Sequence, residues 1–287
     1  MKESFGYLEK YDLSSRSTIR LGPRVDAYFP HTEDALAELL GELSSSGREY
    51  VIGGGLSNLL PSEDPDRYAY VFLDRLNGFS CEGDTLTLGA GCRLGASLLR
   101  AAKEGFYLLP SLVGIPGTVG GALFSNAGAF GEEIGDRVIR ARFFDVQRKA
   151  VLTLDAAQMR LSYRHSIMKE HPLVLLDVTL SRDDSLRERS FRTRITEVKE
   201  IRGRTQPHEP SLGCVFKTHE GTSIGYYLDR LGMKGRSFEG IAVSELHAGF
   251  LVNRGGSIGA MKHLIDELKR EVSIAYGFVP ETEIQIL

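Results

Sequence analysis

The spacing of apolar residues along the chain predicts two clearly amphipathic helices. Residues 32–47 carry four leucines at helical spacing, Thr32 can cap the first turn, and Gly47 can end the helix. A second pattern begins at Ile258 and places its apolar residues on one side of a longer helix. Each helix is expected to lay one face on a core.

Between these helices the pattern changes to short apolar or alternating runs, which are typical of strands. We expect strands at 50–52, 68–73, 85–89, 138–139, 141–146, 151–154, 173–180, 247–253 and 283–287, and further helices at 95–104, 185–202 and 223–231. Strand-rich and helix-rich portions follow one another, so the sequence predicts an α+β fold.

The charged helix expected at 185–202 marks a boundary between two domains. The chain has 287 residues, enough for one large domain or two smaller ones. We expect a first domain over residues 1–195 and a second over residues 196–287. Glutamates interleave with the arginines of this helix, so a solvated helix face is favoured over a nucleic-acid patch.

Composition narrows the class of protein. The net charge of −3 argues against a nucleic-acid binder, and no apolar run approaches the length of a membrane span. The start lacks a core of signal-peptide type, and the seven histidines form no metal motif. Three scattered cysteines, Cys81, Cys92 and Cys214, fit a reduced compartment. We therefore expect a cytoplasmic protein without nucleic-acid, membrane or metal partners.

One segment is unusually rich in glycine. Residues 114–131 read GIPGTVGGALFSNAGAFG, and six of these eighteen residues are glycine. Glycine lets the main chain reach uncommon angles and approach a ligand closely. Two explanations stay open at this point: close packing, or a set of N–H groups around a phosphate-bearing cofactor.

A second glycine loop lies at VIGGGLSNLL, residues 51–60, where an expected strand runs into Gly53, Gly54 and Gly55. Its N–H groups can hold a diphosphate, although no lysine follows as in a phosphate loop of the GxxxxGK type. Alone, the loop is equally consistent with a tight turn. The two loops together favour a long ligand with a central diphosphate over a glycine-rich crossing of packed elements.

Three further segments carry candidate chemistry. Arg164, in YRHSIMK, can pair with a carboxylate, or it belongs to a surface Tyr–Arg pair. Cys214, in RTQPHEPSLGCVFK, is either a buried structural thiol or a proton donor. Glu283, in PETEIQIL, is either an exposed strand-end carboxylate or a carboxyl whose pKa is raised by desolvation.

Taken in order, these segments resemble the UDP-N-acetylenolpyruvoylglucosamine reductase family. The resemblance spans nearly the whole chain, from Ser17 to Ile284, and is most specific in GIPGTVGGALFSNAGAFGEEIGD. It implies an FAD-binding domain of the vanillyl-alcohol-oxidase type, then a smaller α+β substrate domain whose terminal strand returns to the active site. The length leaves no room for the tyrosine-bearing insertion of some members, so the chain resembles the shorter subtype.

The resemblance also implies the reaction. In this family NADPH reduces FAD, and the reduced flavin passes a hydride to UDP-N-acetylglucosamine enolpyruvate, which gives UDP-N-acetylmuramate for peptidoglycan. FAD and NADPH are thus the expected cofactors, the enolpyruvyl sugar nucleotide is the expected small-molecule partner, and we expect a monomer.

By the same resemblance, Arg164 and Glu283 stabilise negative charge on the substrate and Cys214 donates the proton, where many members have serine. Tyr163 and Lys217 match substrate-binding positions. Leu56 departs from the family pattern as an insertion in the glycine loop at 51–60. The expected cofactor-binding residues are Gly53, Gly54, Gly55, Ser57, Asn58, Gly114, Ile115, Pro116, Gly117, Gly120, Gly121, Asn126, Ala127 and Gly128.

Two other functions are weaker alternatives. An alcohol or sugar oxidase of the same fold often tethers its flavin to His or Cys, yet no histidine lies in 48–164 and Cys81 and Cys92 fall outside the glycine loops. A flavin- or nucleotide-binding regulator would be expected to have lost part of the catalytic set, whereas Arg164, Cys214 and Glu283 are all present.

Overall fold

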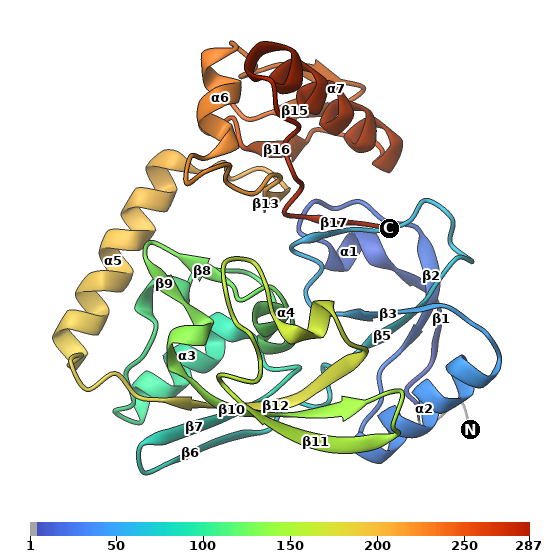
Figure 1. Ribbon diagram of the computed structural model, residues 1–287, viewed down its shortest axis with the longest axis vertical. Helices are drawn as coiled ribbons and strands as arrows, with labels where there is room; N and C mark the ends of the chain where they lie inside the picture. Colours follow the sequence, from blue (N-terminus) through green and yellow to red (C-terminus); the bar gives the residue numbers. More distant parts are fainter. Residues whose placement is uncertain (1–4) are drawn as a thin grey trace. The chain divides into compact units, whose positions relative to one another are not determined.

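The computed structural model describes residues 5–287 and divides into two compact units (Figure 1). A single domain boundary near residue 195 would assign all N-terminal segments to the first unit, but two of them belong to the second unit. The first unit comprises the segment that ends at Lys10, Asp26–Gly55 and Tyr68–Lys199; the second comprises Tyr11–Val25, Leu56–Arg67 and Glu200–Leu287.

The first unit contains two larger sheets, the α-helices α2, α3 and α4, and the first part of α5. One sheet has the order β1-β2-β5-β3, with β5 parallel to β2 and β3. The other is an antiparallel sheet of order β11-β10-β12-β7-β6. The bounds are β1 Leu8–Asp12, β2 Arg24–Tyr28, β3 Tyr50–Gly53, β5 Ala69–Phe72, β6 Phe79–Glu82, β7 Thr85–Gly89, β10 Val138–Asp145, β11 Ala150–Asp155 and β12 Leu173–Ser181, with α2 Glu33–Ser45, α3 Leu94–Lys103 and α4 Val119–Phe124.

Helix α2 confirms the clearest pattern in the sequence. Thr32 is its N-cap, and the Thr32 hydroxyl accepts a hydrogen bond from the Ala35 N–H at 3.1 Å. The four leucines that share a face are its buried residues. The cap and the apolar spacing are local signals, which is why the sequence could place this helix.

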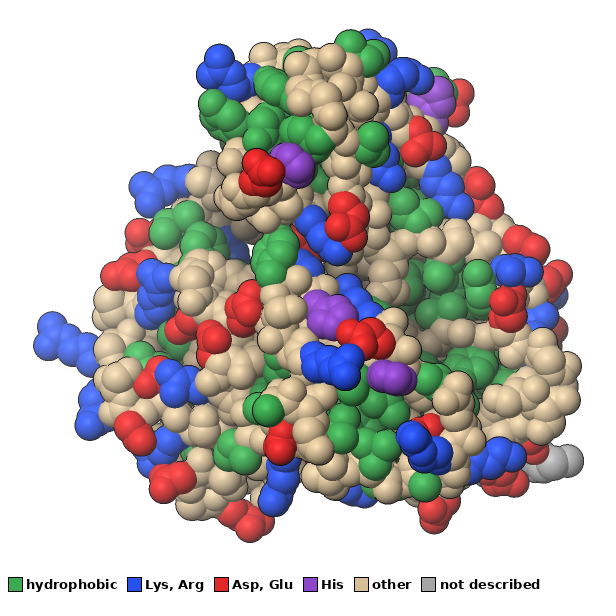
Figure 2. Space-filling view, in the orientation of Figure 1, with side chains coloured by type: hydrophobic (Ala, Val, Ile, Leu, Met, Phe, Trp, Pro, Cys, Tyr) green, Lys and Arg blue, Asp and Glu red, His purple; other side chains and the backbone are tan. Residues whose placement is uncertain are grey.

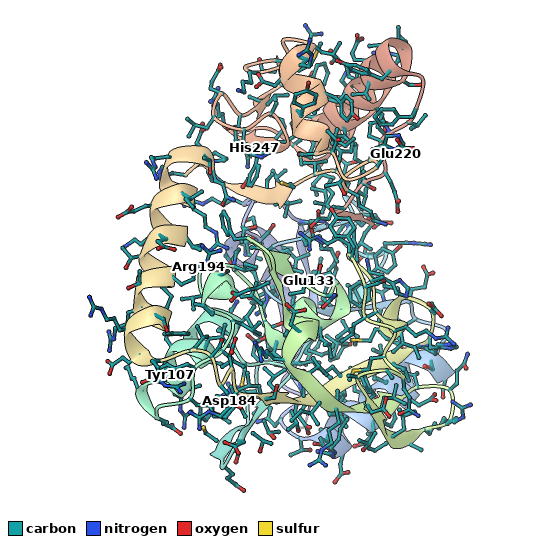
Figure 3. The ribbon with its side chains drawn as sticks, turned by 60° about the vertical axis from the view of Figure 1, so that its left-hand side comes forward. Tyr107, Glu133, Asp184, Arg194, Glu220 and His247 are labelled. Carbon is teal, nitrogen blue, oxygen red and sulfur yellow. The ribbon has the colours of Figure 1, made fainter. Side chains whose placement is uncertain are left out.

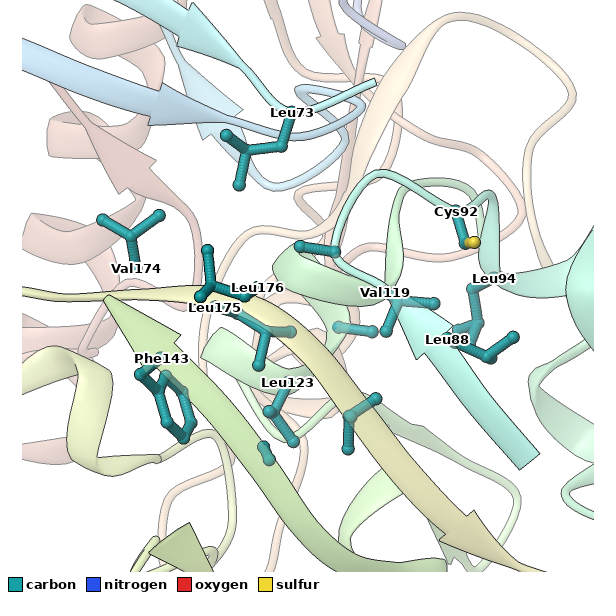
Figure 4. Close-up of a cluster of buried hydrophobic side chains, with 14 of the residues drawn as sticks. Leu73, Leu88, Cys92, Leu94, Val119, Leu123, Phe143, Val174, Leu175 and Leu176 are labelled. Atoms are coloured by element: carbon teal, nitrogen blue, oxygen red, sulfur yellow. The ribbon is translucent and has the colours of Figure 1, made fainter. Parts of the chain in front are cut away.

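Part of the first unit's core packs between the antiparallel sheet and the short helix α4 (Figure 4). Val119 and Leu123 from α4 are fully buried, as are Leu88 of β7 and Phe143 of β10. Burying a side chain of this size contributes about 1.5–3 kcal/mol. This packing fixes α4, which forms the middle of the glycine-rich run 114–131.

The second unit is a four-stranded sheet of order β13-β16-β15-β14 covered by α6 and α7. A separate parallel pair joins the C-terminal strand β17 to β4. The bounds are β4 Leu59–Leu60, β13 Ser211–Cys214, β14 Ser237–Phe238, β15 Ile241–Val243, β16 Phe250–Asn253, β17 Gln285–Ile286, α1 Leu13–Arg16, α6 Ile224–Arg230 and α7 Ile258–Tyr276; α5, Glu188–Thr205, begins in the first unit and ends in the second.

Two strand predictions were too long. The strand expected at 247–253 begins only at Phe250, because the chain turns at His247 and the Phe250 N–H donates to the His247 carbonyl at 3.0 Å. The strand expected at 283–287 is limited to Gln285–Ile286. In both segments apolar character was mistaken for extended structure, since a turn can also bury apolar residues.

The described residues were compared with what a charged patch, a membrane-spanning helix or a metal site would require. Figure 2 shows Lys and Arg side chains interspersed with Asp and Glu over the visible face. Among residues 5–287, no helix combines the length and apolar character that a membrane crossing requires. Over the same residues, His, Cys, Asp and Glu form no group of three or more that could hold a metal ion.

Candidate active site

The two glycine loops contact each other within the first unit. A Cβ placed on Gly55 would lie 2.8 Å from the Gly117 Cα, and one on Gly54 would lie 2.7 Å from the Thr118 hydroxyl oxygen. Gly117 also has a φ of +122°, which side chains rarely adopt. Close packing, one of the two explanations that the sequence left open, therefore accounts for these three glycines directly.

Gly120 and Gly121 lie in the first turn of helix α4, and their surroundings differ. The Gly120 N–H donates to the Ala90 carbonyl at 2.9 Å, so this glycine anchors the helix to the loop after β7. Gly121 is exposed, and a Cβ on it would approach only the Thr118 hydroxyl, at 3.7 Å. Packing does not explain Gly121, whereas close approach of a ligand to the main chain would.

An arginine that the sequence analysis did not single out lies at the crossing of these loops. The Arg93 Nη1 is 3.2 Å from the position of a Cβ on Gly55. Its guanidinium is about half exposed, and its Nη2 is 3.8 Å from Asp74 Oδ1, a long ion pair. Arginine forms strong hydrogen bonds with phosphate oxygens. Open main chain at Gly121 and a cation at Gly55 are features that fit the diphosphate of FAD.

Other residues of the glycine-rich run 114–131 are tied to the first unit's core. Ile115 packs against that core, and its N–H donates to the Leu112 carbonyl at 2.9 Å. Ala127 also packs there, and its N–H donates to Ala122 at 2.7 Å. Gly128 pairs with Glu133 in a two-stranded ladder, β8 Gly128–Ala129 and β9 Glu132–Glu133. These contacts give the loop a fixed conformation.

Helix α5 fixes the end of the same glycine-rich run. Arg194 on α5 donates from Nη2 to the Phe130 carbonyl at 3.1 Å and from Nε to the Ser111 hydroxyl at 3.3 Å (Figure 3). The Ser111 N–H in turn donates to Glu132 Oε2 at 2.7 Å. The sequence favoured a solvated face for this helix, but Arg194 uses its guanidinium to hold the β8–β9 turn.

Arg164 lies at the tip of a tight turn in the first unit. Ser162 and His165 exchange main-chain hydrogen bonds of 3.0 and 3.3 Å, which leaves Tyr163 and Arg164 as the two turn residues. Arg164 has a φ of +54°, and such a conformation in a residue with a long side chain often marks a functional position. Its guanidinium lies over the Tyr163 ring, 5.1 Å from the centroid, and Nη2 donates to the Gly128 carbonyl at 3.3 Å.

Cys214 and Glu283 come from distant parts of the sequence and are brought together in the second unit. The Glu283 N–H donates to the carbonyl of Val215, the residue after Cys214, at 2.8 Å. Asn58 holds the other side of the same segment: its amide donates to the Glu283 carbonyl at 3.3 Å, and its own carbonyl accepts from the Gln285 N–H at 2.9 Å. A thiol and a carboxyl thus lie on adjacent, mutually bonded stretches of chain.

Lys217 forms an ion pair with Glu281 in the second unit. The main chains of the two residues are also paired, with the Lys217 N–H donating to the Glu281 carbonyl at 2.9 Å. Glu281 is largely exposed, and exposed ion pairs contribute little free energy. An anionic ligand can therefore compete with Glu281 for the Lys217 ammonium.

Two groups outside the expected set have clear structural roles. The His247 imidazole accepts the Gly249 N–H at Nδ1, at 3.0 Å, and burial lowers its pKa (Figure 3). The thiol of Cys92 donates to the Gly78 carbonyl at 3.2 Å, and burial raises its pKa. Both groups are neutral at pH 7, the thiol because it keeps its proton.

Comparison with known proteins identifies the fold and the family. Residues 27–153 match a family model described as an FAD binding domain, and residues 206–287 match one described as the UDP-N-acetylenolpyruvoylglucosamine reductase C-terminal domain. A solved reductase of that name from Thermus caldophilus superposes with a TM-score of 0.79 at 26% identity, covering 96% of each chain. The predicted α+β class and FAD-binding domain are confirmed.

Proteins of the same name are similar along the sequence. The reductase of Thermosipho melanesiensis is 36% identical over 264 residues, which cover 90% of this chain and 87% of that protein. The reductase of Caldicellulosiruptor saccharolyticus is 31% identical over 291 residues, with 100% and 93% coverage. This chain therefore belongs to the UDP-N-acetylenolpyruvoylglucosamine reductase family and is an FAD-dependent oxidoreductase.

Proposed function

We propose that this chain reduces the enolpyruvyl ether of UDP-N-acetylglucosamine to UDP-N-acetylmuramate, a step of peptidoglycan precursor synthesis, with NADPH as the reductant. The names of its relatives support the substrate class. The observation that supports the proposal is the 2.8 Å hydrogen bond from the Glu283 N–H to the Val215 carbonyl, because it puts the chain segments that carry Cys214 and Glu283 next to each other.

If bound, FAD would supply the redox chemistry that carries a hydride from NADPH to the terminal carbon of the enol ether. The chain's part is to hold the cofactor and to manage charge and protons. In this proposal the main chain at Gly121 and the guanidinium of Arg93 bind the diphosphate, while Gly55 and Gly117 let the two loops meet. Ser57, Gly114 and Pro116 complete the expected cofactor-binding set.

As the hydride arrives, negative charge develops on the substrate carboxylate. Arg164 supplies a fixed positive charge, and Glu283, if protonated, supplies a hydrogen-bond donor. Cys214 then gives its proton to the α-carbon, so that one hydride and one proton saturate the double bond, and the thiolate regains a proton from solvent. Tyr163 and Lys217 bind the substrate.

We further propose that the protein works as a monomer in the cytoplasm, where sugar nucleotides and NADPH are present. Its three cysteines are free thiols, as suits a reducing compartment. Size-exclusion chromatography with light scattering tests the monomer, and a mass of about twice 31.7 kDa would contradict it.

The first experiment is a coupled assay on the purified protein loaded with FAD. We expect a yellow protein that oxidises NADPH only when UDP-N-acetylglucosamine enolpyruvate is present, and NADH is run in parallel. A colourless protein that does not take up FAD would overturn the proposal, as would NADPH oxidation that ignores the substrate.

The second experiment tests the proton donor. Cys214→Ala should leave flavin reduction by NADPH intact and slow the reduction of the substrate by about 10²–10⁴-fold, the usual contribution of a general acid. Stopped-flow absorbance follows both half-reactions in one preparation. Equal slowing of the two would mean that Cys214 is structural.

A further inference from the structure

Asn126 lies within the glycine-rich run 114–131, shortly after the end of α4, and its side chain contacts protein groups. The residue is only 2% exposed and has a φ of +43°, a conformation that asparagine tolerates better than most residues. It was expected to bind the cofactor. Its contacts indicate another role.

All the usual hydrogen bonds of the Asn126 amide are made within the first unit. Nδ2 has two hydrogens, and it donates to Glu133 Oε2 at 2.7 Å and to the Ser162 carbonyl at 3.1 Å. Oδ1 accepts the Gly135 N–H at 2.9 Å. Glu133, labelled in Figure 3, lies on β9 and keeps the amide in this orientation. No donor hydrogen remains for a cofactor.

The Ser162 carbonyl is the base of the turn that carries Arg164. The Ser162 carbonyl oxygen accepts hydrogen bonds from the His165 N–H, at 3.0 Å, and from the Asn126 amide. These two hydrogen bonds use both lone pairs of the oxygen. The buried Ser166 hydroxyl donates to the Phe124 carbonyl at 2.8 Å on the far side of the turn. The turn is thus attached on both sides to the chain at the end of α4.

A third attachment joins Arg164 itself to this segment. Its Nη2 donates to the Gly128 carbonyl at 3.3 Å, two residues beyond Asn126. Phe124, Asn126 and Gly128 therefore hold the turn at three successive points. A side chain in a strained main-chain conformation keeps its direction only when the surroundings over-determine it.

We propose that Asn126 is a positioning residue for Arg164. The inference rests on the proposed function, in which Arg164 stabilises charge on the substrate. Its amide fixes the Ser162 carbonyl, this carbonyl fixes the turn, and the turn aims the guanidinium. Misplacement of a charged group by about 1 Å can slow a reaction about 10²-fold, so the effect of losing the amide should be large.

The test is a double-mutant cycle measured in single turnovers. Both residues have positive φ, so Asn126→Gly and Arg164→Gly remove side chains without main-chain strain. We expect Asn126→Gly to keep FAD binding and flavin reduction by NADPH, and to slow hydride transfer to the substrate about 10–100-fold. In the Arg164→Gly background, adding Asn126→Gly should slow this step less than threefold.

A core variant separates positioning from loss of stability. Leu86→Ala, in β7, removes a fully buried side chain away from the turn, and should lower the melting temperature without slowing the substrate step per bound flavin. If Asn126→Gly does not fold, Asn126→Ala takes its place, because it also removes both donors and adds no charge beside the Glu133 carboxylate.

The outcomes distinguish this inference from the function on which it rests. If Arg164→Gly leaves the substrate step unchanged, the assigned role of Arg164 is wrong and the inference falls with it. If Arg164→Gly slows that step while the effect of Asn126→Gly is absent or fully additive, only the positioning role is overturned. Loss of FAD from Asn126→Gly with a normal substrate step would return Asn126 to the cofactor site.

Discussion

Arg164 and Glu283 are held in their places by different means. The Arg164 turn is anchored by side chains, the Asn126 amide and the Ser166 hydroxyl, and its own φ is positive. Glu283 is anchored mainly by main-chain hydrogen bonds, since its N–H donates to Val215 and the Gln285 N–H donates to Asn58.

The difference predicts how each region responds to change. Single substitutions can remove a side-chain anchor, so the orientation of Arg164 depends on a few particular residues. Main-chain pairing survives most substitutions, so the position of Glu283 depends on the path of the chain. The four predictions below run from the largest expected effect to the smallest.

Arg164→Gly should slow reduction of the substrate about 10²–10³-fold, because a fixed charge at the developing anion is lost while the main chain keeps its angle. Flavin reduction by NADPH should be unchanged. Stopped-flow measurement of reoxidation of the reduced protein by the substrate checks both. A smaller loss in Arg164→Gly than in Arg164→Lys would show that charge is not the property that matters.

Arg93→Gln should weaken FAD binding about tenfold, which corresponds to about 1.4 kcal/mol, and should reduce the salt dependence of binding. Titration of the apoprotein with FAD, followed by flavin fluorescence at several salt concentrations, measures both. Arg100→Gln is the matched control, since Arg100 is an exposed arginine of α3 that pairs with Glu104. Equal effects of the two variants would remove Arg93 from the diphosphate site.

Asn58→Ala should slow the substrate step about fivefold and leave FAD content unchanged, because one hydrogen bond to the Glu283 carbonyl is lost while the main-chain pairing remains. Asn253→Ala is the control, as its amide donates to the Ile19 carbonyl in the same unit. Loss of flavin from Asn58→Ala would support the cofactor role that the sequence suggested for this residue.

Glu281→Gln should lower the KM for the sugar nucleotide about twofold, because it frees the Lys217 ammonium from an exposed ion pair. Lys217→Gln should raise the same KM. Steady-state assays at low ionic strength give the largest difference. A KM that rises in Glu281→Gln would mean that the pair positions Lys217 for the ligand.

The sequence predicted well those features whose signals are local. The cap and leucine spacing of α2 lie within one segment, and so does the strand that leads into Gly53. Strand β1 was missed because its side chains are mostly exposed and give no apolar alternation. Leu56, which looked like an insertion, has a φ of +47°, and this could not be predicted because leucine rarely adopts a positive φ.

The sequence suggested which residues belong to the candidate site, but it did not show which groups those residues contact. The order of motifs singled out Arg164, Cys214 and Glu283 as candidates, but the main-chain hydrogen bond between Glu283 and Val215 joins residues too far apart in the sequence to be predicted. Asn126 and Asn58 were both assigned to the cofactor because the family resemblance places their segments at the FAD. Their side chains contact protein groups from distant segments, and single-sequence reasoning has no access to such partners.

The contact between Gly55 and Gly117 has a consequence for mutational tolerance. A Cβ on residue 55 would lie 2.8 Å from the Gly117 Cα, and main chain on either side cannot move away without loss of packing. Alanine at position 55 should therefore destabilise the fold, whatever its effect on a ligand. A Cβ on Gly121 would make only an ordinary contact with the Thr118 hydroxyl, at 3.7 Å, so we expect alanine there to leave folding intact. In a saturation library, abundance would report on Gly55, and flavin retention would report on Gly121. Two glycines that look equivalent in the sequence would thus be distinguished by experiment: variants of one would be lost because they do not fold, and variants of the other because they do not keep the flavin.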